Sequence, residues 1–232
     1  MTRLDLSNAI MNWVHRPSFR TPAAAMDVVG TFISLCEEDI NKRLRSREMV
    51  VRVTQPVDGQ YTTLPCDYLE MFDVRLQNGP ELEYQPRPEL ANMHWGHWQQ
   101  APGDPAWSGY TVPSVPWNAG QPKFFSVVGQ QVELIPFPED PDAAAIIPDL
   151  ELAYYQMQQL GPNDGDTSTV LNARPSIYLY GSLIQAAPFL RDDSRMATWG
   201  QLYTAAITAA NEEHQRARTQ GSRLRQRYRR LA

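Results

Sequence analysis

The spacing of the apolar residues changes twice along this chain, from helical to alternating and back to helical. Near the N-terminus they recur every three or four positions, which is the spacing of one helix face. This predicts an amphipathic helix over residues 4–14, with Leu6, Ile10 and Trp13 on its apolar face. A second helix is predicted from residue 22 to about residue 45, because Thr21 can cap its first turn and Pro22 suits its first position.

The middle of the chain alternates apolar and polar residues, which predicts β-strands. The expected pairings are local. Residues 49–54 should pair with 61–64 across a tight turn at Asp58-Gly59, and 71–76 should turn at Asn78-Gly79 toward 82–85. Residues 124–128 and 131–137 are predicted to form a hairpin at Gly129-Gln130, and 150–158 one more strand. The middle third is therefore expected to be an antiparallel β domain.

Helical spacing returns in the last third. A main helix is predicted from about Pro175 to Leu190, preceded by a short segment capped by Thr167 or Ser168, and a long helix from about Arg195 to Gln220. The predicted fold class is α+β, a four-helix bundle of N- and C-terminal helices with an inserted antiparallel β domain and an extended tail. The corresponding segments are residues 1–46, 47–160, 161–220 and 221–232.

A loop rich in tryptophan and proline interrupts the β domain over residues 86–122. Connections of this length without regular structure are uncommon and are usually functional or disordered, and four tryptophans argue against disorder. We expect these side chains to contact a neighbouring subunit or a tail protein; the alternative is that the loop folds back and covers its own sheet. The four are Trp95, Trp98, Trp107 and Trp117.

The C-terminus is strongly basic. Residues 214–232 contain seven arginines and no acid, so the rest of the chain has 21 − 7 = 14 basic and 26 acidic residues, a net charge of −12. Such a tail can contact nucleic-acid phosphates, dock on an acidic protein surface or remain solvated. Apolar residues alternate with the arginines, which favours docking in a protein groove. The predicted docking residues are Arg223, Leu224, Arg225, Arg227, Tyr228, Arg229, Arg230 and Leu231.

Signals for chemistry are weak. No phosphate-binding loop, nucleophile elbow or metalloprotease motif occurs, so we predict no catalytic residue, metal or cofactor. His94 and His97 lack a nearby third ligand for a metal. The acidic run from Glu37 to Asp39 precedes basic residues at helical pair spacing, which predicts a solvated, ion-paired face. Neither a membrane span nor an export signal is predicted.

On the long C-terminal helix, we predict that Trp199 is buried against the other helices. It falls on one apolar stripe with Met196, Leu202, Tyr203, Ala206, Ile207 and Ala210.

The order of these segments resembles the head-to-tail adaptor proteins of tailed bacteriophages. The resemblance is carried by residues 176–195, followed by Trp199 and 203–207, and by residues 6–16, 32–44 and 61–70 in the same order. It covers nearly the whole chain apart from the 86–122 loop, which is longer and richer in tryptophan than the family leads us to expect.

The resemblance implies a ring, commonly of twelve copies, attached below the portal protein in the neck of the virion and assembled in the host cytoplasm. Double-stranded DNA would pass through its lumen during packaging and ejection without sequence-specific binding. The helices would form the ring wall, the β region would extend toward a tail or nozzle protein, and the C-terminal extension would reach the portal. The alternatives are a tail-completion or tail-tube ring protein and, less in keeping with an acidic body, a DNA-binding protein. An enzyme of an unrecognised type is a further alternative.

Overall fold

A computed structural model describes residues 1–15, 22–57, 59–77, 79–87, 121–136, 149–190 and 193–219. The side chains of residues 22–27, 193 and 194 are outside this description. The chain divides into two compact units, one made of Met1–Val50 with Met157–Ala232 and the other of Val51–Gln156. The first unit is helical and the second is built from β-sheets, so the predicted α+β class is confirmed.

The helical unit contains α1 (Arg3–Val14), α2 (Pro22–Arg43), the 3₁₀ turn η2 (Arg47–Met49), α4 (Thr169–Ala173), α5 (Pro175–Leu190) and α6 (Asp193–Thr219). Local sequence explains several of their ends. Thr2 and Asp5 form a capping box at the start of α1, and Ser168 caps α4 through the backbone N–H of Leu171. The expected helix starts at Pro22 and Pro175 are confirmed.

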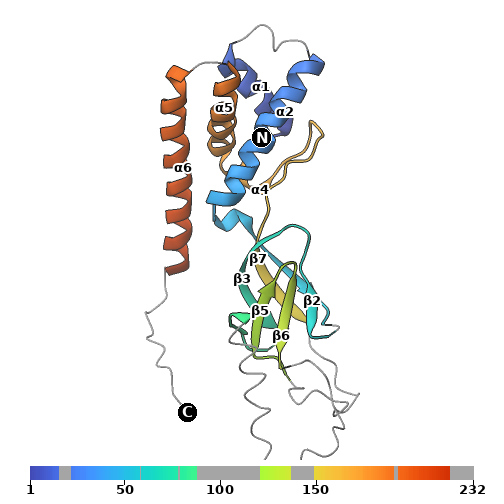
Figure 1. The fold of residues 1–232 in the computed structure, drawn as a ribbon. Coiled ribbons are helices and arrows are strands. Elements are labelled where there is room, and N and C mark those ends of the chain that lie inside the picture. The colour runs from blue at the N-terminus through green and yellow to red at the C-terminus, as the bar shows by residue number, and fades with distance from the viewer. Residues whose placement is uncertain are drawn as a thin grey trace, which may run out of the picture. The chain divides into compact units, whose positions relative to one another are not determined.

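Helix α5 lies at the centre of this unit and contacts α1, α2, α4 and α6 (Figure 1). Its sixteen residues include no charged side chain, as expected of a helix covered on several sides. Gly181 permits the closest approach: a β-carbon there would overlap the Cys36 sulfur of α2 and lie 3.0 Å from the Tyr203 ring of α6. The four long helices predicted from the sequence are present, and their description as a four-helix bundle stays a prediction.

The β unit contains two sheets. The first has the order β1 (Val50–Gln55), β7 (Leu150–Gln156), β3 (Tyr68–Leu76), and the second β2 (Tyr61–Thr63), β6 (Gln131–Ile135), β5 (Phe124–Val128), β4 (Glu83–Tyr84). A single core joins them, because side chains of both sheets belong to one buried cluster. It includes Val74, Leu76, Leu150, Leu152, Phe125, Val132 and Leu134.

The predicted hairpin between residues 49–54 and 61–64 is wrong. Its two strands belong to different sheets, because β1 pairs with β7 and β2 pairs antiparallel with β6. The hairpin of β5 and β6 is confirmed, with Gly129 at φ 62° in its turn. Residues 81 and 82 do fold back on β3, since the N–H of Leu82 donates to the Val74 carbonyl at 2.8 Å. The chain then leaves this sheet, and β4 pairs in parallel with β5.

Candidate assembly surfaces

The interface residues predicted from the sequence all lie outside the described part of the chain. This holds for the four loop tryptophans and for the docking residues from Arg223 to Leu231, and also for His94 and His97. The candidate assembly surfaces described below therefore lie on other residues. The longest described element is α6, in the helical unit.

The inward face of α6 is formed by Trp199, Tyr203, Ile207, Ala210 and His214, all buried. Trp199 is only 4% exposed, which confirms its predicted burial. Tyr203, Ile207 and Ala210 of the predicted stripe are buried as well, whereas two of its members are not: Leu202 is 42% exposed and Met196 is 40% exposed. Leu202 directly precedes the buried Tyr203, so about 100° of helix rotation carries its side chain away from α5.

The outward face of α6 carries no charged side chain between Arg195 and Glu212. A shallow groove of mostly small residues runs along it, lined by Ala197, Gly200, Gln201, Thr204, Ala205, Thr208, Ala209 and Glu212. A β-carbon built on Gly200 would meet nothing within 4 Å. Exposed helix faces of globular proteins are ordinarily polar and charged, so this face departs from the usual pattern. Sequence reasoning missed it, although the absence of charge over sixteen positions was available as a signal.

Polar contacts fix α6 against the end of α2. The Asn211 carboxamide accepts from the backbone N–H of Arg45 at 2.8 Å and donates to the Arg43 carbonyl at 3.0 Å. Arg43 also lies over the Tyr203 ring, 5.6 Å from its centre. Because Asn211 satisfies both a donor and an acceptor at the C-terminus of α2, it sets the position of α6 along that helix.

An ion-pair cluster involves Glu213, two residues after Asn211 on α6. The Arg174 guanidinium contacts Glu213 at 2.7 Å and Glu48 at 3.4 Å, joining α6 to η2. Its hydrogen bond lowers the pKa of Glu213, and burial lowers the pKa of His214 beside it. Glu213 is half-exposed, so the cluster contributes orientation more than stability.

The prediction of a solvated, ion-paired face for residues 37–39 of α2 is wrong at Glu37. Its neighbours Glu38 and Asp39 are ion-paired with Lys42 and Arg43 as expected. Glu37 instead is 6% exposed, and burial raises its pKa to about 7. The carboxylate accepts from the Leu160 N–H at 2.6 Å and from the Tyr178 hydroxyl at 3.4 Å. Sequence spacing could not separate Glu37 from Glu38, because its partners come from a segment more than a hundred residues away.

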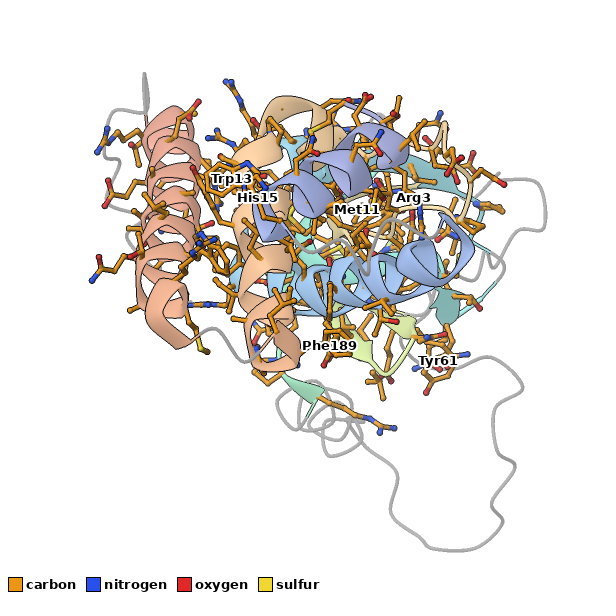
Figure 2. All side chains as sticks on the ribbon, turned by 90° about the horizontal axis from the view of Figure 1, so that it is seen from above. Arg3, Met11, Trp13, His15, Tyr61 and Phe189 are labelled. Atoms are coloured by element: carbon orange, nitrogen blue, oxygen red, sulfur yellow. The ribbon has the colours of Figure 1, made fainter. Side chains whose placement is uncertain are left out.

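The same segment is held by α1 and α2 at further points. Asn41 exchanges two hydrogen bonds with the Gln158 backbone, at 3.0 and 2.8 Å. Arg3, which lies between α1 and α2 in Figure 2, donates to the Gly161 carbonyl at 2.6 Å. These contacts order the connection between β7 and α4. The Cys36 thiol of α2 is buried, and burial raises its pKa to about 12.

Among the described residues of the helical unit, two large aromatic side chains are exposed, Trp13 and Phe189, and both are labelled in Figure 2. Trp13 was expected on the buried face of α1 but is 44% exposed, with its ring edge-on to Tyr180. Phe189 of α5 is 58% exposed and contacts Phe32 of α2. Exposed aromatic groups of this size are typical of surfaces that another protein covers.

Among the described residues, no helix has the length and apolar character needed to cross a membrane, and no three metal-binding side chains are grouped. The model of one protein family, described as SU10 adaptor protein, matches residues 1–227. No curated protein matches the chain.

Proposed function

The chain belongs to the SU10 adaptor protein family, a family of phage structural adaptors, and on that premise we propose that it is a head-to-tail adaptor of a tailed phage. In this role, copies of the chain form an oligomeric ring that links the portal to the tail. The observation that carries the proposal is the extent of the family match, which covers 227 of 232 residues and so includes both units.

The surface of the helical unit supports a role in assembly. The uncharged groove of α6 and the exposed Trp13 and Phe189 are suited to contact with protein. The ring wall would be formed by these helices in a bundle, and the basic residues 223–231 would reach the portal, where arginine can pair with carboxylates. The β unit and the loop tryptophans would contact the tail or a neighbouring subunit.

Charge supports a conduit for DNA. Without the seven arginines of its C-terminal region the chain has a net charge of −12, and like charge disfavours adhesion of DNA that slides past. The alternative of a DNA-binding protein would need basic residues on the folded body. A tail-completion or tail-tube ring is the second alternative, because such a ring would use the same kind of subunit contact.

Electron microscopy and co-sedimentation with purified portal rings of the same phage test the proposal. We expect a ring of about a dozen copies on one end of each portal, and weak binding to duplex DNA at 150 mM salt. A protein that binds tail tubes and ignores the portal would instead be a tail-completion subunit. Tight, salt-sensitive DNA binding without portal binding would contradict the adaptor role.

A further inference from the structure

We propose that the uncharged groove of α6 receives the α2 face around Leu35 from a second copy of this chain, and that this contact closes the ring. The inference rests on the proposed function and adds to it which two surfaces meet. The groove is the one lined by residues from Ala197 to Glu212. The opposing surface, the Leu35 face, consists of Thr31, Ser34, Leu35, Glu38 and Lys42, all exposed.

No contact among the described residues accounts for the composition of the groove. Gly200 lies within α6, where glycine is less favourable than alanine. Gly181 has an internal reason, because a β-carbon there would overlap Cys36, whereas one on Gly200 would meet nothing. Thr204 and Thr208 follow at four-residue intervals and are exposed. Rows of small residues at this spacing allow another helix to approach closely.

The groove and the Leu35 face lie on opposite flanks of the helical unit. Both views place α5 between α6 and α2 (Figures 1 and 2). The inward face of α2 is formed by Phe32, Ile33, Cys36 and Ile40, so Leu35 points away from α5 and is 42% exposed. A contact between one flank of a subunit and the opposite flank of the next is heterologous, and such contacts form rings when the rotation closes.

The groove and the Leu35 face are also chemically complementary. Leu35 offers an apolar side chain next to Thr31 and Ser34, and the groove offers mostly small residues, with Glu212 at its end as the one charged residue that lines it. Each surface ends in an ion pair that neutralises itself, Glu38 with Lys42 at 2.6 Å and Glu212 with Arg216 at 2.9 Å. Neither surface would bring an unpaired charge into the contact. Apart from Glu212, which is paired with Arg216, the groove offers no charge to an acidic, basic or nucleic-acid partner, and this favours a second copy as the occupant.

Two variants of the groove test the contact through sedimentation velocity and mass photometry, both alone and on portal rings. Gly200→Leu fills the groove and Ala205→Arg places a charge in it, and both side chains point to open space in the single subunit. We expect each to raise the apparent dissociation constant for self-association by about tenfold or more while the far-ultraviolet spectrum and melting temperature stay unchanged. The matched control is Gln215→Arg, an exposed position on the charged part of the same helix.

Cross-linking identifies the opposing surface. In a Cys66→Ser background, the double variant Leu35→Cys/Ala205→Cys should give a ladder of covalent oligomers with a short bismaleimide, and either single variant should give none. Dimers from Ala205→Cys alone would show that α6 packs against its own copy and would overturn the inference. Full assembly of Gly200→Leu and Ala205→Arg would overturn it as well, leaving the adaptor role intact. A wild-type chain that never self-associates, alone or on the portal, would contradict the proposed function itself.

Discussion

The carboxylate of Glu37 accepts a 2.6 Å hydrogen bond from the backbone N–H of Leu160, 123 residues further along the chain. The Tyr178 hydroxyl donates to the same oxygen at 3.4 Å. One buried carboxyl group therefore holds together α2, the segment that follows β7, and α5. Arg3 and Asn41 also donate hydrogen bonds to carbonyl groups of that segment. Glu37 therefore lies where the N-terminal and C-terminal parts of the helical unit are joined.

Burial of Glu37 predicts a pH-dependent stability. Its pKa is about 7 in the folded chain against 4.5 in the reference state, so the folded state binds the proton more tightly. This contribution to stability is fully present below pH 4.5 and is lost as the pH rises through about 7. At ~1.4 kcal/mol per pKa unit, a pKa of about 7 against 4.5 corresponds to a loss of about 3–3.5 kcal/mol over the whole titration.

The variant Glu37→Gln isolates this contribution, because its amide oxygen can still accept from Leu160 but does not titrate. Relative to wild type, its free energy of unfolding should rise by about 2–3 kcal/mol between pH 4.5 and pH 8. Urea denaturation at both pH values measures the difference. A constant difference would mean that Glu37 is not protonated in the folded chain. Glu38→Gln is the matched control, since Glu38 is exposed and paired with Lys42.

A matched pair of glycines separates packing within the chain from the open groove. Gly181→Ala should lower the free energy of unfolding by about 1–3 kcal/mol, because the added methyl group overlaps Cys36 where three helices meet. Gly200→Ala should raise it by up to about 1 kcal/mol, since the position is helical and open. Chemical denaturation at a protein concentration too low for assembly measures both. Destabilisation by Gly200→Ala would show that the groove is closed in the single subunit.

The helices could be predicted because their signals are local. Pro22 and Pro175 mark helix starts, and Ser168 is a capping residue three positions before Leu171. The β5–β6 hairpin was predictable for the same reason, as its turn is only two residues long. Within α6, Trp199, Tyr203, Ile207 and Ala210 were placed correctly on the buried face. Met196 and Leu202 were not, because both are apolar and lie at helical spacing at the margin of the same stripe.

The sheet pairing could not be predicted, because β1 and β7 pair across about a hundred residues and nothing in either strand identifies its partner. The adjacent β1 and β2 looked like a hairpin, yet each joins a different sheet. The prediction for Glu37 was wrong for a related reason. Its ionisation depends on Leu160 and Tyr178, whose proximity follows from the tertiary fold and not from the spacing of acidic residues.

Trp199 should be a main contributor to the packing of α6. Replacing it with alanine is expected to cost about 3–5 kcal/mol, the usual range for a buried large aromatic side chain, because it is 4% exposed. Leu202→Ala on the exposed side should change the free energy of unfolding by less than about 1 kcal/mol. Thermal and urea denaturation followed by circular dichroism compare the two. Equal effects would mean that α6 packs through a broader face than the one described.

Asn211 should contribute through both atoms of its carboxamide. Asn211→Ala removes the hydrogen bonds with Arg45 and Arg43, and we expect a loss of about 1–3 kcal/mol in the free energy of unfolding. Asn211→Asp keeps the acceptor for the Arg45 N–H but loses the donor to the Arg43 carbonyl, and should lie between alanine and wild type. An aspartate variant no better than alanine would show that the bond from the Arg45 N–H contributes nothing.

Deleting residues 221–232 should weaken attachment to the portal without changing the fold, because α6 ends at Thr219 and every described element precedes the deletion. The arginines alone would give binding that falls steeply with salt, whereas a groove that also takes Leu224, Tyr228 and Leu231 would depend on those apolar side chains at any salt concentration. Two further variants separate these contributions: one replaces the five arginines from Arg223 to Arg230 with glutamine, and the other replaces the three apolar residues with alanine. We expect both to bind portal rings less tightly in co-sedimentation at 150 mM salt, and only the alanine variant to retain a strong dependence on salt. If the alanine variant binds like wild type, the tail contacts its partner through charge alone. If the deletion variant binds like wild type, the tail has no role in docking.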